Sequence, residues 1–164
     1  MATAAQRKEL LALMDYCVAH RGQIHYPPGD RRTERVGTIK SWVDVHSHIL
    51  RPGGWTIDCS QMDEALLRAV GCRLPFRDGY TGSFLSHPDV IPHYYDGRKA
   101  YVGACVVFGP STGHHMAMVH TPDPKHGNPL LFSHGQESDP RLIHLAQEQA
   151  GQPHPATFCS IAKL

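Results

Sequence analysis

The chain has 164 residues, of which 41% are hydrophobic and 19% are charged, and its formal net charge is +1. This composition predicts one compact domain over residues 1–164 with its own core, and it excludes a largely disordered chain. The near-zero charge gives no electrostatic basis for binding nucleic acid, and no apolar run is long enough to predict membrane insertion.

The first half of the chain carries helical patterns. Apolar residues at helical spacing predict a helix over Arg7–Ala19, in which Cys17 is a buried structural thiol. The segment Lys40–Leu50 fits either a short helix or a strand. Another helix is predicted from Asp58 or Cys59 to about Val70, because apolar residues recur there at i, i+3, i+4 and i+7.

The second half carries strand patterns. Two β-rich segments, Val102–Phe108 and His115–His120, are separated by a glycine-rich turn and predict a hairpin. The other expected elements are long loops over Phe76–Tyr101, a strand over Leu130–His134, a helix over Arg141–Ala150 and a short strand within Thr157–Ala162. Helices followed by antiparallel strands predict an α+β fold, with the helix after Asp58 packed on the sheet.

Cys59 lies where a thiol becomes reactive. It follows the extended, glycine-loosened segment Gly53–Ile57 and starts the second helix. The unpaired N–H groups and the dipole of a helix N-terminus favour a thiolate, which is the nucleophilic form of cysteine. The five cysteines are an odd number without a C-x-x-C pair, which argues against a disulfide framework or a cysteine-rich zinc site.

The ordered motifs resemble the NlpC family of papain-like cell-wall cysteine peptidases. They are GGWTIDCS at 53–60, GCRLP at 71–75, GACVVF at 103–108 and GHHMAMV at 113–119. Two shorter stretches, DGYTG at 78–82 and FSHGQE at 132–137, resemble the N-terminal peptidase domains of endolysins from phages of mycobacteria and related actinobacteria. The resemblance implies a papain-like fold, with N-terminal helices and the nucleophile helix on a small antiparallel sheet.

The resemblance also implies catalytic roles. Cys59 matches the nucleophile, and the catalytic histidine falls at His114 or His115, with the strand pattern favouring His115. Adjacent strand residues face opposite sides, so only one of these two histidines can meet Cys59. The residue that orients the histidine is expected to be His134 or Glu137. First-turn N–H groups beside Cys59 are expected to stabilise the oxyanion, a contact worth about 3 kcal/mol in comparable sites.

Substrate contacts are expected from the loops after the second helix. Tyr80, Tyr94 and Tyr95 are candidates to stack on, or hydrogen-bond to, a peptide stem. Asp58 is a candidate for the same region, with a helix cap as its alternative role. No cofactor or metal is implied.

The sequence therefore predicts an endolysin-type peptidoglycan hydrolase, a cysteine endopeptidase that cleaves an amide bond in the stem or cross-linking peptide of the bacterial cell wall. We expect a monomer that waits in the host cytoplasm until the membrane is permeabilised and then reaches the cell wall. The chain fits either a whole lysin or an excised domain. Alternatives are a catalytically silent peptidoglycan-binding or phage structural module, a papain-like acyltransferase, and a zinc-dependent amidase using His114, His120, His126 and His134.

Overall fold

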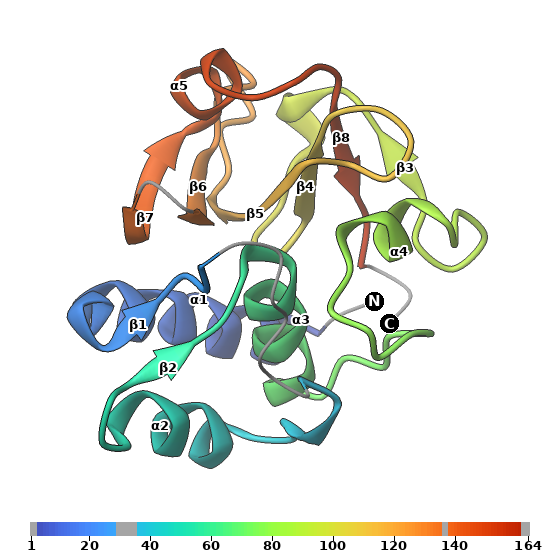
Figure 1. Cartoon of the computed structure of the whole chain (residues 1–164). Coiled ribbons are helices and arrows are strands. Elements are labelled where there is room, and N and C mark those ends of the chain that lie inside the picture. Colours follow the sequence, from blue (N-terminus) through green and yellow to red (C-terminus); the bar gives the residue numbers. More distant parts are fainter. Residues whose placement is uncertain (1–2, 29–35, 136–137, 162–164) are drawn as a thin grey trace.

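The computed structural model describes residues 3–28, 36–135 and 138–161 and has a mixed α+β architecture (Figure 1). The described helices are α1 (Ala4–Ala19), α2 (Trp42–Leu50), α3 (Cys59–Ala69), α4 (Thr81–Leu85) and α5 (Leu145–Ala150), with 3-10 turns at Arg21–Gln23, Val36–Thr38 and Gly97–Lys99. The described strands are β1 (Ile24–His25), β2 (Trp55–Thr56), β3 (His93–Tyr94), β4 (Cys105–Phe108), β5 (His115–Thr121), β6 (Leu130–Gly135), β7 (Ser138–His144) and β8 (Ala156–Cys159).

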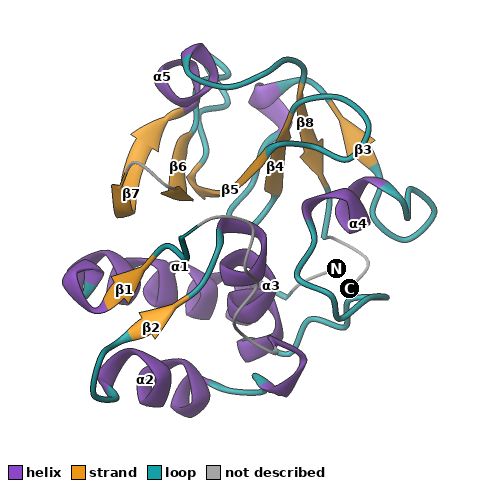
Figure 2. Cartoon of the chain, in the orientation of Figure 1, coloured by secondary structure: helices purple, strands orange, loops and turns teal. Residues whose placement is uncertain are grey.

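Six of these strands form one antiparallel sheet in the order β3-β8-β4-β5-β6-β7. The helices α1, α2 and α3 lie on one side of it, and α5 lies at the other end of the molecule (Figure 2). The predicted hairpin is confirmed, because β4 pairs with β5 so that Phe108 faces His115 and Cys105 faces Met118. Within the described residues, no helix is both long and apolar enough to cross a membrane.

The sheet separates two apolar clusters. On one face, Met116, Met118 and Phe132 join the large core formed with α1 and α3. On the other face, Ala117, Val119 and Leu131 join a smaller core that includes Leu145 of α5. Because side chains alternate along a strand, each residue of β5 and β6 faces one core or the other.

The predicted helices α1 and α3 are confirmed, and both begin with a capping box. Thr3 caps α1 with Gln6, and Asp58 caps α3 with Gln61. Cys17 lies on the inner face of α1 and is fully buried, as expected of a structural thiol. Helix α3 is buried on nearly every side, so its polar residues Ser60, Asp63 and Glu64 are enclosed along with its apolar ones.

Two expectations about secondary structure change. Residues 141–144 belong to strand β7, and only residues 145–150 form the predicted helix, because 141–144 pair in register with β6. The segment Phe76–Tyr101 is not entirely loop, since it contains α4 and β3. The undecided segment Lys40–Leu50 forms helix α2, capped by Ser41.

The chain entering α3 is fixed by a short parallel pair. Strand β2 pairs with β1 through Ile24–Trp55 and His25–Thr56, and the Ile57 N–H donates to the His25 carbonyl at 2.9 Å. Gly54 makes this approach possible, because a Cβ there would overlap the backbone of Gln23. The chain just before Cys59 is therefore held in place by contacts at residues 54–57.

Replacing Gly54 with alanine should destabilise the protein much more than replacing Gly53. Both glycines have positive φ, +69° and +85°, but a Cβ on Gly53 would meet nothing within 4 Å. We expect Gly53→Ala to cost about 1 kcal/mol from backbone conformation alone. Gly54→Ala adds the overlap with Gln23 and should cost at least about 3 kcal/mol. Urea unfolding of both variants measures this difference, and equal costs would contradict the close approach of β1 and β2.

Candidate active site

Cys59 is the first residue of α3. The Asp58 carboxylate caps the helix by accepting from the Gln61 N–H at 2.8 Å, and Ser60 Oγ donates to the Gly79 carbonyl at 2.7 Å. Cys59 is 5% exposed, so the thiol lies in an almost dry setting at the positive end of the helix dipole. Asp58 thus has the capping role that was the alternative to substrate binding.

His115 begins β5 and meets Cys59. It is 6% exposed, its ring stacks on Phe108 with centroids 5.8 Å apart, and its side chain is close enough to Cys59 for the two to interact electrostatically. The neighbouring His114 is exposed, as strand alternation requires when His115 faces inward. The structure therefore brings Cys59 and His115 together and leaves His114 outside.

The third member of the site is Glu148 of α5. Its Oε1 lies 2.9 Å from His115 Nε2, and Ser133 Oγ donates to the same oxygen at 2.9 Å. Ser133 Oγ is also 3.0 Å from His115 Nε2. Because Nε2 is occupied by these partners, Nδ1 is the ring nitrogen left to serve Cys59.

The charges of this group reinforce one another. Burial alone would lower the pKa of His115, but its hydrogen bonds and charge interactions with Cys59 and Glu148 raise that pKa from 6.5 to about 10. Burial would raise the pKa of Glu148, yet His115, Ser133 and Arg141 together hold it below its usual value. His115 is therefore an imidazolium paired with a carboxylate at neutral pH.

His134, one of the two expected orienting residues, has a different contact. Its Nε2 donates to the Ile57 carbonyl at 2.8 Å, and its Nδ1 has no partner among the described residues. Burial lowers its pKa to about 4, so it is neutral at neutral pH. Ser133, its neighbour, faces Ala117 across the β5–β6 pair and so shares a sheet face with His115. His134 lies on the opposite face and supports the segment before Cys59.

Glu137, the other expected orienting residue, lies outside the described residues. Neither Glu148 nor Ser133 was singled out from the sequence. Glu148 lies in a segment, Arg141–Ala150, that shows only a weakly amphipathic helical pattern. That pattern does not predict which strand residues the helix packs against. Strand alternation would have separated Ser133 from His134 only if the register of β6 against β5 were already known.

Tyr26 is a further site residue that sequence reasoning missed. Its hydroxyl lies 3.8 Å from Cys59 Sγ and also interacts with the Cys59 backbone N–H. Its ring centroid is 5.3 Å from that of His134. Burial and the neighbouring Cys59 raise the pKa of this phenol, so it remains a hydrogen-bond donor. No periodic pattern surrounds Tyr26 that would have indicated this position.

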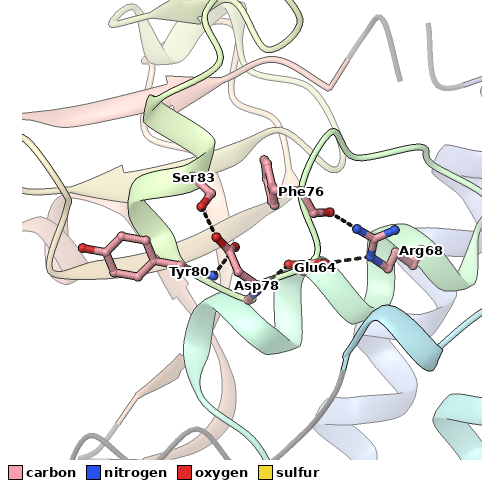
Figure 3. Close-up of polar contacts among 7 residues, drawn as sticks. Glu64, Arg68, Phe76, Asp78, Tyr80 and Ser83 are labelled. Atoms are coloured by element: carbon pink, nitrogen blue, oxygen red, sulfur yellow. Dashed lines mark hydrogen bonds and ion pairs between the residues drawn. The ribbon is translucent and has the colours of Figure 1, made fainter.

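The segment around Gly79 is attached to α3 by a buried carboxylate (Figure 3). Glu64 accepts from the Gly79 N–H at 2.8 Å and from Arg68 Nε at 2.7 Å, and Arg68 also donates to the Phe76 carbonyl. Asp78 continues this network by accepting from the Tyr80 N–H at 3.1 Å and from Ser83 Oγ at 2.7 Å. The segment is thus fixed to the same helix that carries Cys59.

Tyr80 lies between the loops that flank the site. A Cβ on Gly82 would be 2.6 Å from Tyr80 Cε1 and 3.2 Å from the Thr112 carbonyl, so the ring covers Gly82 beside the turn that leads into β5. Figure 3 shows this ring pointing away from the Asp78 network. Of the three expected tyrosines, Tyr80 is the one adjacent to the segments that carry Cys59 and His115.

Tyr94 and Tyr95 lie elsewhere. Two strands separate β3 from β5 in the sheet, a distance of about 14 Å at the usual strand spacing. The ring of Tyr94 stacks on Phe158 with centroids 5.1 Å apart, and Tyr95 is 69% exposed. The structure therefore does not bring either tyrosine to Cys59.

The four histidines considered as zinc ligands are not gathered at one place. His120 contacts Asp15 at 2.9 Å, His126 contacts Asp123 at 3.3 Å, and His134 contacts the Ile57 carbonyl. Among the residues that the structure describes, no group of three or more His, Cys, Asp or Glu side chains is placed to hold a metal ion.

Asp63 is a buried carboxyl one helical turn after Cys59. It is 2% exposed, and its Oδ2 has no hydrogen-bond partner within the described residues. Burial raises its pKa well above the usual value, although the nearby His115 acts in the opposite direction. A buried polar group without a partner lowers stability, so Asp63 is a costly residue beneath the site.

Cys59, His115 and Glu148 contact one another in the same succession as the triads of cysteine hydrolases and acyltransferases. In those triads a base activates a thiol and an acid orients the base. No family model, curated protein or solved structure matches the chain. The chemistry is therefore inferred from this arrangement of side chains.

Asp63→Asn should stabilise the protein, and the gain should grow with pH. A carboxyl whose folded pKa is raised favours folding while protonated and opposes it as pH rises above its unfolded pKa near 3.8. We expect little gain near pH 4 and about 1 to 3 kcal/mol at pH 8, measured by urea unfolding. Asp89→Asn removes one exposed charge and is the control. A gain independent of pH would contradict the buried ionisation of Asp63.

Proposed function

We propose that the protein is a papain-like, NlpC-type cysteine endopeptidase that hydrolyses an amide bond in bacterial peptidoglycan. The observation that carries this proposal is the contact of Cys59, at a helix N-terminus, with a buried His115–Glu148 pair. The arrangement of a nucleophile helix against an antiparallel sheet that carries the histidine supports the papain-like assignment. The motifs at 53–60 and 113–119 support the NlpC type and its cell-wall substrate.

The triad accounts for acylation. The Cys59 thiolate attacks the carbonyl carbon while His115 keeps the thiol proton on Nδ1. The tetrahedral intermediate collapses when His115 gives that proton to the leaving amine, and a thioester remains on Cys59. Water then attacks the thioester, with His115 accepting its proton, and the carboxyl product leaves. Throughout, Glu148 holds Nε2 and stabilises the imidazolium.

Tyr26 supplies a donor for the oxyanion in this mechanism. Its hydroxyl lies beside both the Cys59 sulfur and the Cys59 backbone N–H. In the proposed mechanism the phenol and that N–H both donate to the negative charge that develops on the carbonyl oxygen. Such donors contribute about 3 kcal/mol in comparable sites.

The biological setting follows from the substrate. A phage-type lysin of this class stays in the host cytoplasm until the membrane is permeabilised, and then acts on the wall as a monomer. The location of Tyr80 beside the turn before β5 supports the proposal that it contacts a peptide stem. These assignments depend on the proposed substrate.

The first test is digestion of purified actinobacterial peptidoglycan, followed by mass spectrometry of the released fragments. We expect new amino ends in the stem or cross-linking peptides, complete loss of release with iodoacetamide or Cys59→Ala, and no effect of a metal chelator. Alkylation should map to Cys59 while the fully buried Cys17 stays unmodified. Inhibition by the chelator alone would favour a zinc amidase. Binding without release would favour a silent module, and transfer to an added amine would favour an acyltransferase.

Glu148→Gln should reduce activity far more than His134→Gln. The charge of Glu148 raises the pKa of His115, so its loss should move the alkaline limb of the kcat/KM profile from near pH 10 to lower pH. We expect a loss of about 100-fold or more at neutral pH. His134→Gln keeps a donor for the Ile57 carbonyl and should leave the alkaline limb in place. If His134→Gln moved the limb and Glu148→Gln did not, His134 would be the orienting residue.

A further inference from the structure

Arg141 occupies a defined place behind the candidate triad. It lies on β7 directly opposite Ser133 of β6, so the two side chains share a face of the sheet. Helix α5 follows β7 immediately and brings Glu148 over this face. Ser133 and Arg141 are thus neighbours beneath one carboxylate.

The two oxygens of Glu148 have different partners. Oε1 contacts His115 Nε2 and Ser133 Oγ, each at 2.9 Å. Oε2 accepts from an Arg141 terminal nitrogen at 3.2 Å. The Arg141 side chain is 39% exposed and that of Glu148 only 3%, so the guanidinium reaches from partial solvent to a buried acid. The orientation of Glu148 does not depend on Arg141 alone, because Ser133 and His115 hold the other oxygen.

We propose that Arg141 is a positioning residue that limits the basicity of His115 by sharing the negative charge of Glu148. This inference rests on the proposed function of the triad. The geometry supports it, because the cation contacts the carboxylate oxygen that faces away from His115. Among the described residues, the ion pair of Arg141 is with Glu148, and no hydrogen bond or ion pair joins Arg141 to Cys59 or His115.

The chemistry of the triad explains why such a limit is useful. His115 must hold a proton beside the thiolate and then release it to the leaving amine. An imidazolium held by Glu148 and Cys59 releases that proton reluctantly, since both partners raise the pKa of His115, which is about 10 with Arg141 in place. Arg141 is a second cation on the Glu148 carboxylate. It weakens the attraction between Glu148 and the His115 proton, while the contact between Glu148 and His115 remains.

Other ionisable groups also interact with His115 through their charges and must be the same in every variant that is compared. They are Cys59 and Asp63 on α3, His134 on β6 and Glu148 on α5. All four residues are retained in the variants that replace Arg141. The control variant Arg98→Gln removes an equal charge from the exposed Arg98–Asp96 pair.

The test is an NMR titration of histidine-labelled protein, with the His115 signal identified by its absence in His115→Gln. In Arg141→Gln we expect the His115 midpoint to rise by about 0.5 to 1 pH unit, because a nearby positive charge is lost. Arg141→Lys keeps the charge and should shift the midpoint less. Arg98→Gln should leave it unchanged, and Glu148→Gln should lower it.

A midpoint that stays constant or falls in Arg141→Gln would overturn the proposal, since a purely structural clamp on Glu148 predicts a fall. With peptidoglycan as substrate, we further expect kcat to drop by roughly two- to three-fold at neutral pH with KM unchanged. The titration needs no substrate. Failure of the proposed hydrolysis therefore leaves the midpoint readout intact, and the two failures are distinguishable.

Discussion

The buried ion pair between His115 and Glu148 is the interaction on which the rest of the candidate site depends. Both side chains are nearly enclosed, so each would carry a large desolvation cost without the other. Ser133 and Arg141 satisfy the remaining acceptors of the carboxylate, which makes the buried charges tolerable. The pair also connects α5 to β5 across the smaller core. Cys59 gains its partner only because this arrangement holds the imidazole in one orientation.

Residues on the two faces of the sheet position different members of the candidate site. On the face towards α5, Ser133 supports Glu148 and so orients His115. On the face towards α3, His134 donates to the Ile57 carbonyl and so positions the start of α3, which carries Cys59. Adjacent residues of one strand thus support opposite members of the candidate pair, His115 and Cys59. A displacement of β6 would disturb both members together, because the strand is common to both supports.

Local patterns were sufficient to predict the elements that carry Cys59 and His115. The periodicity of α3, the Asp58 cap and the β4–β5 hairpin are encoded within short stretches, and each is confirmed. Glu148, Ser133 and Tyr26 could not be found in that way, because their roles arise from strand register and from contacts between distant segments. The location of Tyr94 away from Cys59 could not be predicted for the same reason, because its ring packs on Phe158, in a strand 64 residues later in the chain. Strand β7 was missed because residues 141–144 gain their structure from pairing with β6.

The order of strands in the sheet has a consequence for synthesis. Strand β8 (Ala156–Cys159) lies between β3 and β4, so an inner strand of the sheet is made after both of its neighbours. The acid on α5 also emerges late, long after Cys59. A nascent chain therefore exposes an unpaired edge of β4 and lacks its carboxylate until translation has passed both elements. Ribosome-bound intermediates consequently hold Cys59 and His115 without the carboxylate that orients the imidazole until α5 has been made.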